Sequence, residues 1–420
     1  MGPIIIFDKS SLQSLSVDES VWLENFFLTN LTPLFYIETL VDIEKEVRGN
    51  QTPQQIVSNI ALKTPQNSYP NMHHSRLLVY NLLGGKVDMS NRPNLGGGVF
   101  KESPDGRIGV HYEKFPEAEA MQRWQEEKFL EIEKNFARKW RQSLSNIDFD
   151  YMVGLTKNII PKGKKFKHLE EIKSFVDHFV QGGYRELYEL AFEVLKVPDG
   201  LRSNIMSRWE KEQYPGLTVF APYAAYVLKV NLFLFLSMYS SFISKDRPSN
   251  MIDIAYLYYL PFCMVFTSND KLHIKTASLF MEQGQIFIQG QDLKSSLKEL
   301  DEYYSKLPNE IRNQGVMKFA VYPPEEMNTL VVNLWDKLLP IWRKHSKEKN
   351  KRPIVPKESE KNTVDNMNRL VKEARTLNNT SQISDDEVDH MVFKRMVLIK
   401  KGKWRLLPPE VEKANRKDEL

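Results

Sequence analysis

Two aspartates stand at the ends of short, mainly apolar runs that lie far apart in this 420-residue chain. Ile4–Phe7 runs into Asp8, and Phe262–Thr267 is followed three residues later by Asp270. A strand buried on both faces reads as a near-continuous hydrophobic run, and ligands of open α/β sheets collect at the carboxyl ends of the strands. The pattern predicts two carboxylates that converge on one point, as a divalent-metal site requires.

The elements that would position these acids alternate between strand and helix at the N-terminus. Apolar runs predict strands over Ile4–Phe7 and Leu34–Ile37, and helical spacing predicts helices over Ser11–Leu28 and Thr39–Val47. Such an alternation is typical of a parallel sheet with right-handed crossovers.

The middle of the chain reads as mainly helical. After a stretch rich in Pro, Asn and Gly, the turn signal Pro104-Asp105-Gly106 predicts a small hairpin between Val99–Lys101 and Arg107–His111. Helical spacing then predicts five helices, over Glu117–Leu144, His168–Phe179, Tyr184–Val194, Leu201–Trp209 and Ala221–Ile243.

Alternating α/β character returns near Pro248. Strands are expected over Phe262–Thr267 and Gln285–Gln289, and helices over Ile254–Leu260, Leu272–Glu282, Leu293–Leu307 and Asn328–Trp342. A polar stretch to about Asp386 reads as a linker, and Met391–Lys400 with Lys403–Leu407 resembles a basic hairpin.

In this arrangement the sequence resembles the PIN-like nucleases. Ser268-Asn269-Asp270 fits the family's pattern of a strand, then Ser or Thr, one spacer and Asp before a helix. Glu38 follows the second predicted strand and Asp253 opens the helix before the third, where the family also places acids. The resemblance covers residues 1–48 and 246–292.

The resemblance implies a metal-dependent nuclease. Hard cations such as Mg²⁺ or Mn²⁺ take carboxylate oxygens without His or Cys cages. Such an ion supplies charge neutralisation and a deprotonated water for in-line attack on a phosphodiester. The ligands implied, which are also the catalytic residues, are Asp8, Glu38, Asp253 and Asp270, with Asp8 and Asp270 as the principal pair.

Several neighbouring residues bear on this assignment. Ser10 and Ser268 could hold waters or orient a carboxylate, and Asp42 could support the site from outside it. Asp246 is an alternative to Asp253 as the third acidic residue of the site. His273 would lie near the site in a mainly structural role. Against a functional role, an Asp after a strand is often only a helix N-cap.

The predicted fold class is α/β, with a PIN-like (Rossmann-like) parallel sheet flanked by helices, a large mainly α-helical insertion and a C-terminal extension. The predicted parts are the first part of the PIN-like domain (1–48), a mainly helical insertion with a small hairpin (49–245), the second part of the domain with trailing helices (246–343), a polar linker (344–386) and a basic C-terminal hairpin and tail (387–420).

Composition restricts the setting and the partners. The 58 basic and 54 acidic residues leave a formal charge of +4, which permits a nucleic-acid partner without requiring one. The single cysteine excludes an internal disulfide and indicates a reducing compartment. Lys229 and Asn231 interrupt the apolar stretch Tyr223–Ile243, which favours a buried helix over a membrane span. We expect a cytoplasmic protein with no membrane partner.

Two basic clusters offer a path for a nucleic acid, expected to be RNA. One surrounds Phe166 and the other Trp404, and such clusters can neutralise phosphates while an aromatic ring stacks on a base. The basic residues are Lys157, Lys162, Lys164, Lys165 and Lys167 in the first cluster and Lys394, Arg395, Lys400, Lys401, Lys403 and Arg405 in the second. Solvated lysine loops are the alternative interpretation.

The predicted activity is that of an endoribonuclease, and two alternatives stay open. The first is a catalytically degenerate PIN-like scaffold that binds a protein partner, or a second copy of the chain, through the helical insertion. The second is a phosphohydrolase that acts on small phosphate esters or nucleotides at the same metal site.

Overall fold

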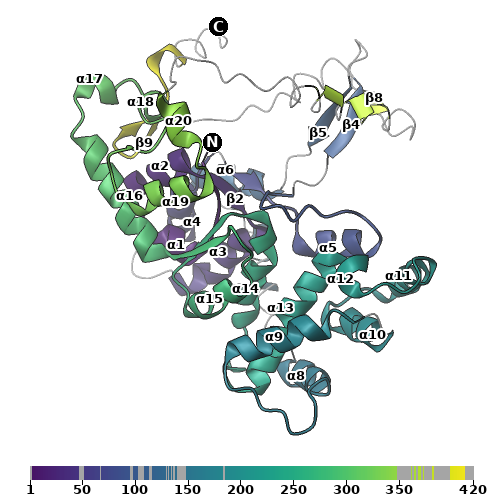
Figure 1. Cartoon of the computed structure of the whole chain (residues 1–420). Helices are drawn as coiled ribbons and strands as arrows, with labels where there is room; N and C mark the ends of the chain where they lie inside the picture. Colours follow the sequence, from purple (N-terminus) through teal and green to yellow (C-terminus); the bar gives the residue numbers. More distant parts are fainter. Residues whose placement is uncertain are drawn as a thin grey trace.

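A parallel sheet organises the computed structural model (Figure 1). The structure describes residues 2–46, 52–66, 68–94, 98–102, 108–112, 116–128, 148–182, 185–347 and 398–411, with scattered positions between 130 and 139 and between 361 and 382.

Four strands of four residues each form the body of the sheet, and a two-residue strand extends one edge. All pairings are parallel. The strand order is β3 (Tyr69–Pro70), β2 (Leu28–Leu31), β1 (Ile4–Phe7), β6 (Val265–Ser268), β7 (Ile286–Gln289). The direction of winding reverses between β1 and β6, and the crevice at such a switch point is where open α/β sheets bind ligands.

The run of apolar residues in β1 serves two cores at once. Ile4 and Ile6 face a core that they share with the long helix α13 (Pro222–Tyr239). Ile5 and Phe7 point to the opposite face, into a second core. Successive side chains of a strand point to opposite faces, so this central strand has to be apolar throughout.

Helices from the N-terminal part follow and cover the first strands. A capping box between Ser16 and Glu19 starts the second of them, because the serine oxygen and the glutamate satisfy the free N–H groups of the first turn. The bounds are α1 Lys9–Ser14, α2 Val17–Phe26, α3 Pro33–Glu46, α4 Pro53–Lys63, α5 His74–Leu82 and α6 Pro116–Gln125.

A group of helices packs around α13. Figure 1 draws this group in teal, beside the sheet. Nearly every side chain of α13 from Tyr223 to Met238 is buried. Its neighbours are α8 Phe149–Lys157, α9 Leu169–Phe179, α10 Arg185–Val194, α11 Asp199–Lys211 and α12 Leu217–Phe220.

The chain then returns to the sheet and adds β6 and β7 with their helices. The bounds are α14 Asn250–Ala255, the 3₁₀ helix η1 Tyr256–Phe262, α15 Lys271–Thr276, η2 Ala277–Leu279, α16 Gly290–Ser305, α17 Asn309–Arg312, α18 Val316–Phe319, α19 Leu330–Leu338 and α20 Trp342–Lys347.

Two small antiparallel pairs lie outside the main sheet. β4 (Gly98–Glu102) pairs with β5 (Ile108–Tyr112), which confirms the predicted hairpin, and β8 (Ser381–Gln382) joins β4. The basic C-terminal hairpin is confirmed as well, although its strands β9 (Lys400–Lys401) and β10 (Trp404–Arg405) are short. The predicted positions 391–397 lie outside the described residues.

The second strand was predicted in the wrong place. Leu34–Ile37 belongs to α3, and the strand is formed by residues 28–31. Pro33 occupies the first position of α3, where a proline costs no hydrogen bond. The strand was overlooked because Thr29 and Asn30 interrupt its apolar character, yet both are buried. Glu38 therefore lies inside a helix and not at a strand end.

Several helices differ in extent or continuity from the prediction. The predicted helix Ser11–Leu28 is two helices, because the chain leaves helical geometry at Leu15 and Ser16. The predicted helix Glu117–Leu144 is interrupted after Gln125; the described positions 132, 133, 135, 138 and 139 are helical again, and the rest of 129–144 apart from Leu130 lies outside the described residues. The stretch 254–260 is split between α14 and the 3₁₀ helix η1. Helices α4 and α5, in the Pro- and Asn-rich stretch, were not predicted.

No helix in the described part of the chain has both the length and the apolar character that crossing a membrane requires.

Candidate metal centre

Asp8 stands at the carboxyl end of β1 and caps the helix that follows. Its Oδ1 accepts the backbone N–H of Ser11 at 2.8 Å, and the residue is only 2% exposed. Its Oδ2 accepts two hydroxyls, from Ser10 at 2.7 Å and from Ser268 at 2.6 Å. Since Ser268 is the last residue of β6, this carboxylate joins the two strands at the switch point.

Ser268 links Asp8 to two further residues of the cluster. Its Oγ accepts the N–H of Asp270 at 2.9 Å and lies 2.7 Å from Nδ1 of His273. The other ring nitrogen, Nε2, lies 2.5 Å from the carbonyl oxygen of Asp253, which can only accept. Because Ser268 gives its one hydroxyl proton to Asp8, Nδ1 must donate to Ser268. The network is satisfied in full when His273 carries both protons.

The charges around His273 favour the same protonation state. Burial alone would lower the pKa of His273, but the adjacent Asp8 and the nearby Asp253 raise it to about 9. Its Nδ1 lies 3.8 Å from Oδ2 of Asp8, and both side chains are almost completely buried. A buried cation thus lies against the central carboxylate.

Glu38 reaches the cluster from the second turn of α3. Its Oε2 accepts the phenol of Tyr256 at 2.7 Å and the backbone N–H of Lys9 at 3.4 Å. Burial, and then repulsion by Asp8, raises the pKa of Glu38 to about 8. This side chain therefore holds a proton at neutral pH and gives it up just above.

Asp253, on α14, has a similarly perturbed carboxyl group. Burial raises the pKa of Asp253 to about 7; repulsion by Asp270 and Asp8 adds to the shift, while the cation of His273 opposes it. Such mutual repulsion requires that the carboxylates lie near one another. The rival Asp246 is exposed and bonds to Ser244.

Asp270 follows β6 and caps α15. Its Oδ1 accepts the backbone N–H of Leu272 at 2.6 Å and that of His273 at 3.4 Å. The structure thus brings all four predicted acids to one edge of the sheet, with Asp8 and Asp270 joined through Ser268. It also shows that Asp8 and Asp270 act as helix caps, the structural role that their position suggested.

Lys9 and Tyr256 also belong to the cluster, and sequence reasoning missed both. The Nζ of Lys9 lies 3.0 Å from Asp42, and the lysine side chain is 2% exposed. Asp42 therefore supports the site through Lys9. The available signals were local: Lys9 follows Asp8 directly, and Tyr256 lies one helical turn after Asp253.

The chemistry of this donor set fits a hard divalent cation. Carboxylate oxygens predominate, and burial with like-charge repulsion raises the pKa values of Glu38 and Asp253, so a bound cation would relieve an existing electrostatic cost. Within the described residues, however, no three His, Cys, Asp or Glu side chains are already grouped around one point. The ligands would have to converge as the ion binds.

Comparisons with protein-family models, with curated proteins and with solved structures find no match to this chain. The resemblance to the PIN-like nucleases stays a prediction.

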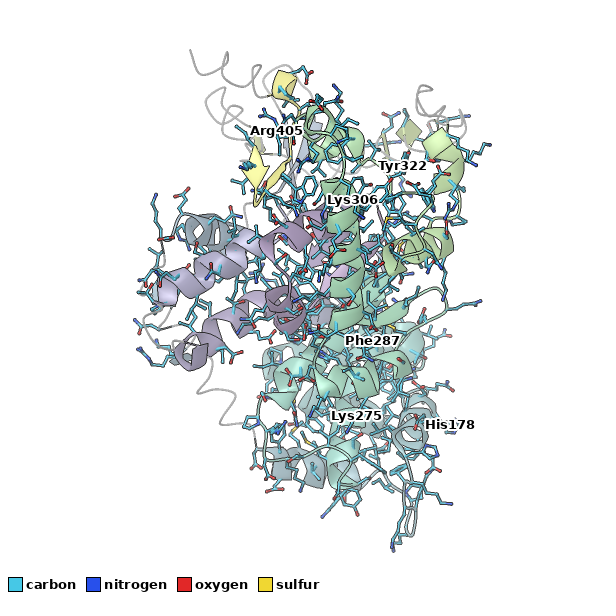
Figure 2. All side chains as sticks on the ribbon, turned by 90° about the vertical axis from the view of Figure 1, so that its left-hand side faces the viewer. His178, Lys275, Phe287, Lys306, Tyr322 and Arg405 are labelled. Atoms are coloured by element: carbon cyan, nitrogen blue, oxygen red, sulfur yellow. The ribbon has the colours of Figure 1, made fainter. Side chains whose placement is uncertain are left out.

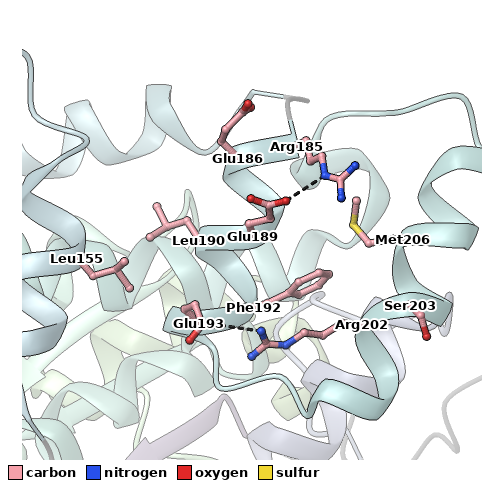
Figure 3. A pocket seen from close by; sticks show the side chains of 10 residues that line it. All are labelled: Leu155, Arg185, Glu186, Glu189, Leu190, Phe192, Glu193, Arg202, Ser203 and Met206. Carbon is pink, nitrogen blue, oxygen red and sulfur yellow. Dashed lines mark hydrogen bonds and ion pairs between the residues drawn. The ribbon is translucent and has the colours of Figure 1, made fainter.

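A separate hollow of about 680 Å³ lies among α8, α10 and α11 (Figure 3). Its charged groups are largely paired with each other: Arg185 bonds Glu189 at 3.0 Å, and Arg202 bonds Glu193 at 2.6 Å. Most charged groups of the hollow are therefore neutralised by a partner of opposite charge, unlike the mutually repelling carboxyl groups at the sheet edge.

The C-terminal basic cluster is placed differently from expectation, whereas the lysines of the other cluster are exposed beside Phe166. Trp404 is 1% exposed and its indole N–H bonds Asp301 at 2.7 Å, so it cannot stack on a base as expected. Lys401 is buried and pairs with Glu24 at 3.1 Å. In the other cluster, the ammonium of Lys164 lies over the ring of Phe166. Lys394 and Arg395 lie outside the described residues.

Proposed function

We propose that this protein is a nuclease that depends on Mg²⁺ or Mn²⁺ and hydrolyses internal phosphodiester bonds of RNA. The observation that carries the proposal is that Asp8, Glu38, Asp253 and Asp270 lie at one edge of the sheet, near the β1–β6 switch point, with raised pKa values at two of them. Strongly perturbed carboxyl groups at such a place are typical of functional sites.

Asp8, Glu38, Asp253 and Asp270 would hold the ion. When bound, it would supply charge neutralisation at the phosphate and lower the pKa of a coordinated water. The serines Ser10 and Ser268 fix the orientation of the Asp8 carboxylate.

Glu38 is suited to proton transfer. Its pKa of about 8 lies close to neutral pH, and a general base works best when its pKa is near the working pH. Tyr256 and the backbone of Lys9 hold its Oε2 in place. We infer that Glu38 would accept a proton from the attacking water only after a bound cation has displaced the proton that the carboxyl holds at neutral pH.

The experiment is metal-dependent RNA cleavage by Asp8→Asn and Asp270→Asn. Asparagine keeps the oxygen that caps each helix and removes the charge. It also places an amide NH₂ where Oδ2 of Asp8 accepts the hydroxyls of Ser10 and Ser268, so circular dichroism must first show that both variants fold. We expect cleavage to fall by at least about a hundredfold. Asp246→Asn, at an exposed position away from the cluster, is the matched control and should keep full activity. Undiminished cleavage by both site variants would refute the proposal.

A catalytically inactive scaffold is the second candidate. This candidate is favoured by the hydrogen bonds that Asp8 already makes. Its two carboxylate oxygens accept hydrogen bonds from three groups, and the cation of His273 lies beside them. Titration calorimetry with MnCl₂ separates the candidates, because a scaffold does not need the ion. Saturable heat that is lost in Asp8→Asn supports the nuclease, and its absence in the wild type supports the scaffold. Competition by free nucleotides would instead indicate a phosphohydrolase.

A further inference from the structure

A polar cavity of about 430 Å³ lies between α17 and the C-terminal hairpin β9–β10. None of its eight lining residues is acidic, and four of them carry a positive charge. The polar and charged side chains that line it are Asn309, Arg312, Asn313, Lys400, Lys403 and Arg405.

Arg312 has a hydrogen-bonding group with no partner. Its Nε is buried and makes no hydrogen bond among the described residues, while its terminal nitrogen donates to Asn309. An unpaired buried donor costs free energy, and a guanidinium presents its donors in a fork that matches phosphate or carboxylate. Arg312 thus brings to the cavity lining a charged guanidinium whose Nε has no acceptor among the described residues.

The hairpin divides its basic residues between two roles. Lys403 is used for anchoring, because it bonds Asp301 at 2.5 Å and lies 3.8 Å from Asp18. Lys400 is exposed and has no ion-pair partner among the described residues. Arg405 bonds the carbonyl of Leu407 through Nε. Among the described residues, Arg312 and Lys400 are thus the lining cations with no ion-pair partner.

Helix α16 connects this cavity with the carboxylate cluster. At its start, a Cβ on Gly290 would lie 2.7 Å from Oγ of Ser11 and from the side chain of Asn269, so the helix begins against the cluster. Eleven residues later, Asp301 bonds Lys403 and Trp404 of the hairpin. At 1.5 Å per residue the separation along the helix is about 17 Å. Figure 2 shows the arrangement, with Arg405 near Lys306 and with Phe287 toward the other end.

We propose that the cavity between α17 and the hairpin binds a backbone phosphate of the single-stranded RNA that is cut at the carboxylate cluster. The proposal rests on the nuclease function for the identity of the ligand. The length of α16 from Gly290 to Asp301, about 17 Å, corresponds to about five nucleotides at the rise of 3.4 Å per phosphate of a stacked strand, so the RNA has to span at least this number. A polynucleotide can therefore reach both places, whereas a mononucleotide cannot.

The test is binding of a fluorescein-labelled oligouridylate of about 12 nucleotides, measured by fluorescence anisotropy in EDTA so that cleavage plays no part. Arg312→Gln should raise Kd about fivefold near 0.1 M KCl and make the slope of log Kd against log salt shallower by about 0.7. Lys400→Gln, an exposed change that spares the fold, should act in the same direction.

Controls separate this site from general electrostatics. The double variant Lys86→Gln/Lys211→Gln removes two exposed charges from the helical region and should leave Kd and the salt slope nearly unchanged. Unchanged binding by both Arg312→Gln and Lys400→Gln would overturn the phosphate site, whatever the cleavage assay shows. Polyglutamate that displaces the RNA at equal charge concentration would overturn it in favour of an acidic peptide ligand. If the protein bound no metal but Arg312→Gln still weakened RNA binding, the nuclease function would be refuted and the phosphate site would stand.

Discussion

Lys9 and His273 lie against the acids of the candidate site and offset part of their charge. Lys9 pairs with Asp42, and His273 bridges Ser268 and the carbonyl of Asp253. The acids themselves could be selected from the sequence, because an Asp after an apolar run is a local signal. Lys9 could not be selected, since its role depends on a contact with Asp42, 33 positions away. His273 was expected near the site, but its bonds to Ser268 and Asp253 could not be predicted.

The protonation of the cluster predicts how stability depends on pH. The pKa values of Glu38 and His273 are raised to about 8 and about 9, and that of Asp253 to about 7. In each case the folded protein keeps a proton that the unfolded chain releases at lower pH, so the free energy of unfolding falls as pH rises toward 9. His74 acts in the opposite sense but only on the acid side, because burial lowers its pKa to about 4.

Thermal melts in EDTA at pH 6.5 and pH 9 check this prediction. We expect the Tm of the wild type to fall between pH 6.5 and pH 9. The Tm of Glu38→Gln should fall less, because this variant lacks one of the carboxyl groups with a raised pKa. Added Mg²⁺ should stabilise the wild type more at pH 9 than at pH 6.5, since an ion competes with the protons. A wild-type Tm that falls no more than that of Glu38→Gln would contradict the assigned pKa of Glu38.

At the scale of elements, the strands that carry Asp8 and Asp270 were predictable and the element that carries Glu38 was not. β1 is apolar along its whole length, and β6 begins with Val265 and Phe266 after an apolar stretch; both strands are fully buried. β2 contains Thr29 and Asn30, which hydrogen-bond Ser68 and the carbonyl of Phe262. Those partners are invisible in the sequence. Glu38 still reaches the cluster, because α3 starts at the sheet edge where β2 ends.

The C-terminal hairpin is fastened to α2 by a buried ion pair, and we predict that breaking it is costly. Lys401 and Glu24 are 3.1 Å apart with side chains 0% and 9% exposed. Lys401→Ala leaves Glu24 buried without its partner, so it should lower the free energy of unfolding by about 3 kcal/mol. Urea denaturation measures the change.

The double variant Glu24→Gln/Lys401→Met is the control for that experiment. It removes both charges, and glutamine keeps an acceptor for the N–H of Gln66, which now bonds Glu24. Its stability should lie clearly above that of Lys401→Ala. If the single and double variants were equally destabilised, the ion pair would not be the feature that holds the hairpin.

At the scale of the whole molecule, the helical region and the sheet share a core. Ile4, Ile6 and Phe266 of the sheet pack in one cluster with Leu228 and Phe233 of α13. The helical region thus covers one face of the sheet that carries the acids. The sequence indicated that this region is helical, but its attachment depends on contacts between residues more than two hundred positions apart.

The most direct test of the metal site is a crystal structure of the protein soaked in MnCl₂. The account predicts an anomalous difference peak at the β1–β6 switch point, ligated by carboxylate oxygens of Asp8 and Asp270 together with Glu38 or Asp253. The peak should be absent from crystals of Asp8→Asn. A fully soaked crystal with no manganese at that edge of the sheet, or with manganese bound only elsewhere, would contradict it.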